Sequence, residues 1–158
     1  MFEADENGVI ASVTATGLRR VIATMILGLL GLLLISVMLG RPITLVTVVT
    51  LGGFGVIALG MSYLVWQSTG GSVYLTETDV RDSDGRILAT LDNIEKVERG
   101  VFAIKPSNGF VLVTKTPQGR MWAPGLYWRL GRRVGVGGVV PAGATKFMAE
   151  QIAFKTGT

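Results

Sequence analysis

Two long stretches without any charged residue constrain this sequence most. No Asp, Glu, Lys or Arg occurs between Arg20 and Arg41, and none occurs between Arg41 and Glu77. Each stretch holds a run of mostly apolar residues about 20 residues long, the length that a helix needs to cross the hydrocarbon core of a bilayer. The sequence therefore predicts two transmembrane helices, at about 21–40 and 45–66, and excludes an ordinary soluble domain.

The link between the two apolar runs is short and reads Gly40-Arg41-Pro42-Ile43-Thr44. Gly favours the end of one helix, Arg suits the headgroup region, and Pro favours the start of the next helix. We therefore expect a transmembrane helical hairpin over residues 18–68. A cleaved signal peptide is the competing interpretation of the first run. That run is long, starts late and leads into a second span, which disfavours a signal peptide.

Positive charge and aromatic residues mark the ends of the hairpin. Two arginines precede the first helix, whereas the link offers one. The positive-inside rule therefore predicts that both termini are cytoplasmic. Five residues are expected to be interfacial anchors: Arg19, Arg20, Arg41, Tyr63 and Trp66.

Small residues gather in the second run, and Gly52, Gly53 and Gly60 are the candidates for close helix packing. Small faces let membrane helices approach closely. Two uses stay open, packing within the hairpin and docking onto another membrane protein. Before the hairpin, residues 1–17 carry three acidic residues and a mixture of small residues, which predicts a flexible or loosely docked cytoplasmic tail.

After Gly70-Gly71 the pattern changes to short alternating runs that are typical of β-strands. We expect a small antiparallel β domain over 70–158, shaped as a barrel or sandwich. Its predicted strands lie at 73–80, 86–90, 94–99, 101–105, 110–115 and 120–123. Turns are predicted at 82–85, 106–109 and 116–119. A final helix is expected to open at Pro141 and to present an apolar side made of Phe147, Met148, Ile152 and Phe154.

This order resembles the bacterial pleckstrin-homology-like (PH-like) membrane proteins, in which a β domain follows a transmembrane hairpin. The resemblance rests on the segment 73–79 (VYLTETD), the turn Asp84-Gly85 and the segment 91–97 (LDNIEKV), and it covers roughly residues 20–115. It implies a bent antiparallel sheet or barrel closed by a C-terminal helix, in the inner membrane of a bacterium. It implies a binding module and no activity. The segment 122–140 does not align to the family pattern.

The segment 115–146 is basic and aromatic, and it contains no acidic residue. Aromatic rings and basic side chains together suit a membrane interface. Six residues are therefore candidates for membrane or partner contact: Trp122, Tyr127, Trp128, Arg129, Arg132 and Arg133. In the alternative interpretation, the aromatic residues fill the small core and the arginines solvate its surface. Nucleic acid is disfavoured for a membrane-tethered chain whose net charge is only +4.

Composition and spacing exclude several chemistries. The chain has no His and no Cys, which removes His bases, Cys nucleophiles and Cys- or His-ligated metals. The turn at 82–85 is no calcium loop, because Val80 and Leu91 stand at ligand positions. The glycine-rich segment 131–138 fits neither a dinucleotide fingerprint nor a P-loop, which favours a flexible or tightly turning surface loop. Phosphate contact by Arg132 and Arg133 stays open there. We expect no cofactor, no metal and no enzyme activity.

The predicted function is that of an accessory or assembly subunit, which docks onto a larger membrane complex through its hairpin and its β domain. The alternative is a membrane-surface module that binds anionic lipid headgroups. The expected partners are membrane lipids and another integral membrane protein.

Overall fold

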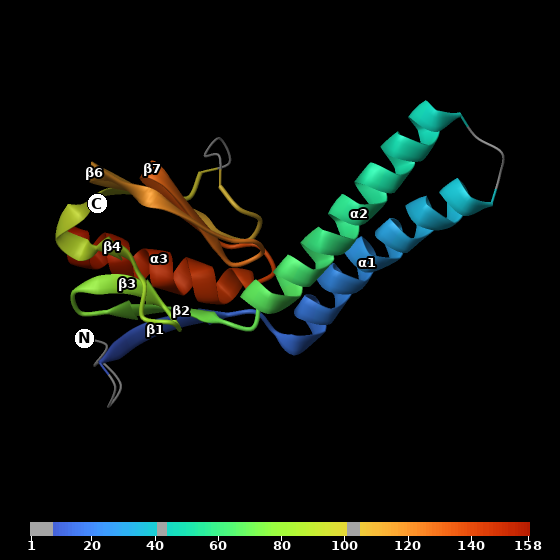
Figure 1. The fold of residues 1–158 in the computed structure, drawn as a ribbon. Helices are drawn as coiled ribbons and strands as arrows, with labels where there is room; N and C mark the ends of the chain where they lie inside the picture. Colours follow the sequence, from blue (N-terminus) through green and yellow to red (C-terminus); the bar gives the residue numbers. More distant parts are fainter. Residues whose placement is uncertain (1–7, 41–43, 101–104) are drawn as a thin grey trace.

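The computed structural model describes residues 8–40, 44–100 and 105–158. It has two parts, a helical hairpin and a β domain attached to one end of that hairpin (Figure 1). The hairpin consists of α1 (Gly17–Leu39) and α2 (Leu45–Ser68), and both helices are long and apolar enough to cross a membrane. Most of their large apolar side chains are exposed, as lipid-facing helices require. The prediction of two long apolar helices is confirmed, while Arg41 lies outside the described residues.

The first sheet of the β domain has the strand order β1-β2-β3-β4 and is antiparallel throughout. Its strands are β1 (Val9–Thr14), β2 (Ser72–Thr76), β3 (Asp79–Asp82) and β4 (Ile87–Thr90). The predicted N-terminal tail is therefore wrong for the residues of β1. Val13 lies opposite Val73 and is fully buried, and Ala11 is buried beside it. Alternation of these apolar residues with exposed Ser12 and Thr14 fits a half-buried strand.

The second sheet has the order β5-β6-β7 and follows a short 3-10 turn, η1 (Leu91–Asn93). Its strands are β5 (Ile94–Glu98), β6 (Phe110–Ala123) and β7 (Tyr127–Val136). The turn predicted at 116–119 is wrong, because β6 runs through it with irregular pairing on both sides of Gln118. The loop predicted at 131–138 is also wrong as far as Val136. The predicted strand at 101–105 falls mainly on 101–104, outside the described residues.

The ribbon formed by β6 and β7 bends back on itself. The Gly137 N–H donates a hydrogen bond to the Leu126 carbonyl at 2.9 Å, so the two ends of β7 lie together. Trp128 packs directly on Gly135, where a Cβ atom would lie 2.4 Å from the indole ring. The bend lets one ribbon cover the core from two sides, which explains why a glycine-rich segment forms a strand here.

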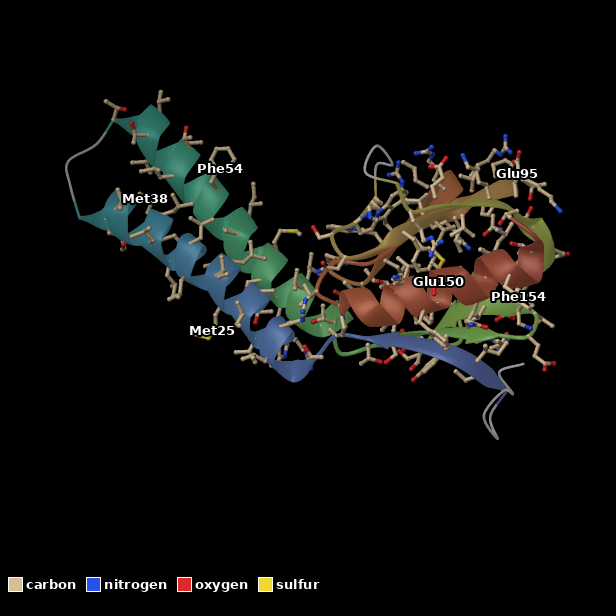
Figure 2. All side chains as sticks on the ribbon, turned by 180° about the vertical axis from the view of Figure 1, so that it is seen from behind. Met25, Met38, Phe54, Glu95, Glu150 and Phe154 are labelled. Atoms are coloured by element: carbon tan, nitrogen blue, oxygen red, sulfur yellow. The ribbon has the colours of Figure 1, made fainter. Side chains whose placement is uncertain are left out.

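Helix α3 (Ala142–Thr156) packs against both sheets, chiefly against β1 and β5. It opens after Pro141 as predicted, and Met148, Ala149 and Ile152 are fully buried in the core. The predicted apolar side is only half correct, because Phe154 is 86% exposed. Figure 2 shows Phe154 at the end of α3 that lies away from the hairpin. The general layout of a hairpin followed by two small antiparallel sheets and a final helix agrees with the prediction.

Candidate functional site

One arginine and one tryptophan fix the open end of the hairpin. Arg20 donates from Nε and Nη2 to the Trp66 carbonyl oxygen, at 3.1 and 2.6 Å. Its guanidinium carbon also lies 3.9 Å from the centre of the Trp66 ring, in a cation–π contact. Arg20 and Trp66 are thus interhelical partners as well as predicted anchors. Arg19 and Tyr63, the other described anchors, are exposed.

Small residues bring the two helices into close contact along a continuous seam. A Cβ atom on Gly31 would lie 2.9 Å from the Gly55 carbonyl oxygen, and one on Gly55 would lie 2.8 Å from Ile35. Nearer the β domain, the Ser62 hydroxyl donates to the Thr24 carbonyl at 2.7 Å. Gly31 was not among the glycines predicted for helix packing. The signal was available, since Thr24, Gly28, Gly31, Ile35 and Met38 follow the three-and-four spacing of one helix face.

The three glycines predicted for helix packing separate into two groups. Gly52 belongs to the seam, because a Cβ atom there would lie 3.1 Å from the Met38 sulfur. Gly53 and Gly60 do not, because a Cβ atom on either would meet nothing within 4 Å. Both are exposed and lie seven residues apart, on one face of α2. The structure therefore brings only Gly52 into the hairpin contact.

The β domain is held against the last turn of α2. The Ser68 hydroxyl donates to the Pro124 carbonyl at 2.6 Å, and Gly125 lies against Thr69 and Val65. Gly125 has a φ of +83°, and a side chain there would also clash with Thr69. A glycine is required for both reasons. These contacts attach the turn between β6 and β7 to the end of the membrane helix.

The three predicted aromatic contact residues have different environments. Trp122 is 60% exposed and borders a cleft of about 270 Å³, which Leu64 and Gln67 of α2 also line. Trp128 lies opposite Trp122 in the ribbon, but it packs on Gly135. Tyr127 is buried, and its hydroxyl donates to Asp82 at 2.6 Å. Tyr127 belongs to the core, as the alternative interpretation of these aromatic residues expects. Trp128 is half-buried on Gly135 and lies outside the core cluster, and Trp122 is the one of the three that is largely exposed beside the hairpin.

The three predicted contact arginines are held by partners within the domain. Arg129 donates to the Gly119 carbonyl at 2.7 Å, and to the Ile87 carbonyl on β4 at 2.8 Å. Since β4 and β7 belong to different sheets, Arg129 bridges the two sheets. Arg132 contacts the Thr114 carbonyl and Glu95. Arg133 pairs with Glu98 at 3.2 Å.

These assignments alter the role expected of the arginines. A guanidinium whose N–H groups already donate to carbonyl and carboxylate oxygens has fewer donors left for a lipid headgroup. The phosphate contact considered for Arg132 and Arg133 is weakened for the same reason, because both lie on a strand and face acidic partners. The alternative in which these arginines solvate the domain surface is also incomplete, because Arg129 is a structural bridge.

Several buried titratable groups of the domain have shifted pKa values, among them Asp79, Asp82 and Tyr127. The Arg81 guanidinium, with help from Thr76, lowers the pKa of Asp79 below its usual value despite burial. Burial raises the pKa of Asp82, but hydrogen bonds from Tyr127 and from the Arg86 and Asp84 amides outweigh it and lower the pKa overall. Burial, together with the bond to Asp82, raises the pKa of Tyr127. Both aspartates are saturated with donors, which marks them as structural groups.

The described ranges 8–40, 44–100 and 105–158 contain no group of three or more acidic residues arranged to hold a metal ion. The chain was also compared with known proteins at three levels. No protein-family model, no curated protein and no solved structure matches it.

Proposed function

We propose that this chain is a non-catalytic accessory or assembly subunit of the bacterial inner membrane, which docks onto another integral membrane protein through one face of α2. The occupant of that face is a transmembrane helix of the partner. We further infer that both termini are cytoplasmic and that the β domain is PH-like. Its bent ribbon and its C-terminal helix support that family assignment.

The observation that carries this proposal is the open surface over Gly53 and Gly60. Gly disfavours a helix by about 1 kcal/mol relative to Ala in water, so glycine in a helix interior needs a reason. Gly31 and Gly55 have one, the hairpin seam, whereas Gly53 and Gly60 face no neighbour within 4 Å. Small residues on the surface of a membrane helix let a second helix approach closely, so this face can accept another membrane helix.

The side chains around these glycines form the walls of a groove on this face. Val56 and Ile57 lie between them along the chain and are 64% and 61% exposed. Figure 2 shows Phe54 projecting from the outer side of α2. A helix that docked over Gly53 and Gly60 would bury these apolar walls by packing, the main source of helix association in lipid.

The contact between α2 and the β domain supports a role in assembly. The Ser68 hydroxyl donates to the Pro124 carbonyl and Thr69 lies against Gly125, so the turn between β6 and β7 is packed on the end of α2. A helix docked on α2 is therefore placed at a defined position relative to the β domain. We propose that the domain contacts the cytoplasmic face of the same partner.

Photocrosslinking in native membranes tests the proposal. A photoreactive amino acid at Val56 should yield a specific adduct with another membrane protein, and the same group at Ile26 of α1 should not. Gly53→Ile with Gly60→Ile should abolish the adduct, because the new side chains fill the groove. Ile57→Leu is the matched control and should retain it. Adducts to lipid alone, or only to a second copy of the chain, would contradict the proposal.

Membrane-surface binding is the second candidate function, and the exposure of Trp122 beside Leu64 of α2 favours it. An indole at that place suits headgroup depth. Since the chain contains no Cys, a spin label on Trp122→Cys reports one position. Its accessibility to oxygen dissolved in the bilayer should exceed that of a label on Lys155→Cys. Equal accessibility at the two positions would argue against contact between this surface and the bilayer.

A further inference from the structure

A basic cavity of about 540 Å³ opens beside the first turns of α3. The segment at Asn108 and Gly109 forms another of its walls. Its charged lining residues come from three segments of the chain: Arg99, Lys105, Lys146 and Glu150. Three positive charges stand against one negative charge, so the cavity attracts anions. The volume falls within the range of about 300–1,000 Å³ that is typical of small-ligand pockets.

The one acidic residue of the cavity is already paired. Glu150 accepts from Arg99 at 3.3 Å, and Figure 2 shows Glu150 in the middle of α3. Lys105 and Lys146, in contrast, make no ion pair or side-chain hydrogen bond within the described ranges. Both are exposed. The excess charge of the cavity therefore resides on two ammonium groups without a protein partner, which are available to an anion.

The start of α3 adds to this positive potential. Its first turn contains no acidic residue, and Pro141 supplies no side-chain cap. The Thr145 hydroxyl contacts carbonyl oxygens, including that of Asn108, and so does not cap the helix amides. The space beside Gly143 is open. The positive end of a helix dipole thus reinforces the field of the two lysines.

The cavity also lies at the end of the domain that meets the hairpin. The Val139 N–H, three residues before α3, donates to the Gly125 carbonyl at 2.9 Å. Gly125 in turn lies against Val65 and Thr69 of α2. Figure 1 shows the N-terminal end of α3 beside the last turn of α2. With α1 and α2 crossing the bilayer as proposed above, an anion at this place would lie near the headgroup region that the hairpin enters.

We propose that this cavity binds the phosphate group of an anionic phospholipid, with Lys105 and Lys146 as its main contacts. The site is distinct from the α2 groove and from the arginines that sequence analysis singled out. Its ammonium groups act as unpaired point charges, which suit a phosphate without demanding a fixed donor geometry. Binding there would fix the level of the β domain on the leaflet surface.

The test uses the full chain in a neutral detergent, titrated with fluorescent phosphatidylglycerol or fluorescent phosphatidylcholine. We expect phosphatidylglycerol to bind preferentially and salt to weaken its binding. Lys105→Gln with Lys146→Gln should weaken phosphatidylglycerol binding about 25-fold, the product of about fivefold for each lysine. Lys96→Gln with Lys155→Gln removes the same charge elsewhere and should leave it unchanged. Lys105→Arg with Lys146→Arg should retain it.

Two outcomes would overturn the site. One is equal binding of the two lipids by the wild-type chain. The other is a loss of phosphatidylglycerol affinity in the Lys96 and Lys155 control as large as that in the Lys105 and Lys146 variant. Displacement of the probe by inorganic phosphate at the concentration at which phosphatidylglycerol binds would overturn the lipid as the source. Thermal melts establish that each variant is folded. The Val56 photocrosslink should persist in the Lys105 and Lys146 variant, so failure of this site and failure of the α2 groove are distinguishable.

Discussion

Arg20 joins the start of α1 to the end of α2 by donating two hydrogen bonds to the Trp66 carbonyl and by lying over its ring. The carbonyl oxygens in the last turn of a helix lack intrahelical donors and carry partial negative charge. A cation on the neighbouring helix satisfies one of them. The same contact seals the hairpin at the point where the β domain begins.

Replacement of Arg20 should therefore loosen the hairpin. We expect Arg20→Ala to lower the free energy of unfolding in detergent by about 1–3 kcal/mol, since a charged hydrogen bond and a cation–π contact are lost. Arg20→Lys should be intermediate, because it keeps the charge but loses the paired donors. The neighbouring exposed Arg19→Ala is the control. A melt of Arg20→Ala equal to that of Arg19→Ala would show that the contact contributes no stability.

Enlarging Gly31 should separate the two helices. A Cβ atom there would lie 2.7 Å from the Leu59 side chain and 2.9 Å from the Gly55 carbonyl, which is closer than packed atoms approach. We expect Gly31→Ala to destabilise the hairpin by about 1–3 kcal/mol through overpacking. Spin labels on Ile26→Cys and Ile57→Cys should report a longer interhelical distance. Gly53→Ala should leave that distance unchanged, because its Cβ would enter open space.

The pair of Asp82 and Tyr127 predicts two limits for the stability of the β domain. The folded pKa of Asp82 lies below its ordinary value of 3.8, so its contribution is present above that pH and is lost as the pH falls through it. The folded pKa of Tyr127 lies above its ordinary value of 10.0, so its contribution is present below pH 10 and is lost as the pH rises further. Chemical denaturation across the pH range should show a plateau between about 5 and 9.

Two substitutions separate these limits. Asp82→Asn should reduce the acid loss, although Asp79, whose pKa is also lowered, retains part of it. Tyr127→Phe should reduce the alkaline loss and lower stability by about 1.5–3 kcal/mol at neutral pH, since a hydrogen bond to the buried Asp82 carboxylate is removed. If both variants kept the wild-type pH profile, the pair would not govern either limit.

Arg129 should prove to be structural. It contacts Ile87, Leu88, Gly119 and Gln118, and so connects β7 with β4. We expect Arg129→Ala to destabilise the domain by about 2 kcal/mol and to speed amide exchange in β4, because a charged side chain with several acceptors is lost. Arg133→Ala, which breaks one partly exposed ion pair, should change stability by less than about 1 kcal/mol. Unchanged exchange in β4 would argue against the bridge.

Local sequence patterns predicted the elements whose stability is local. Both membrane helices follow from continuous apolar runs, and α3 follows from Pro141 and its periodic apolar residues. β4 and β5 lie within the strands predicted at 86–90 and 94–99 for the same reason. The single strand predicted at 73–80 is wrong, because the chain turns at Glu77 and Thr78 and forms two paired strands, β2 and β3. Long-range pairing was beyond such patterns. Val9 pairs with Thr76 across the whole hairpin, and nothing in the first 17 residues indicates where their partner lies.

The ribbon of β6 and β7 illustrates a second limit. Pro117 and Gly119 are ordinary turn residues, and the glycines from Gly131 onward are ordinary loop residues. Here they allow a long ribbon to bend, and Gly135 leaves room for Trp128. Likewise, the sequence around a strand arginine looks the same whether its side chain is solvated or donates to a carbonyl oxygen of another sheet. Only the tertiary arrangement distinguishes the two for Arg129.

The pairing of β1 with β2 makes a final prediction about the boundaries of the β domain. Residues 70–158 alone lack β1, and this leaves the edge of β2 unpaired and uncovers the buried Val73 and Leu75. Exposed apolar strand edges favour aggregation. We therefore expect 70–158 to be insoluble or partly unfolded, whereas residues 8–15 fused to 70–158 by a short flexible linker should give a soluble domain with a cooperative melt.

Val13→Asp in that fusion should abolish the cooperative melt, because it buries a charge opposite Val73, while Ser12→Asp on the exposed face should not. A cooperative melt of 70–158 alone would show that β1 is dispensable and that the domain begins after the hairpin.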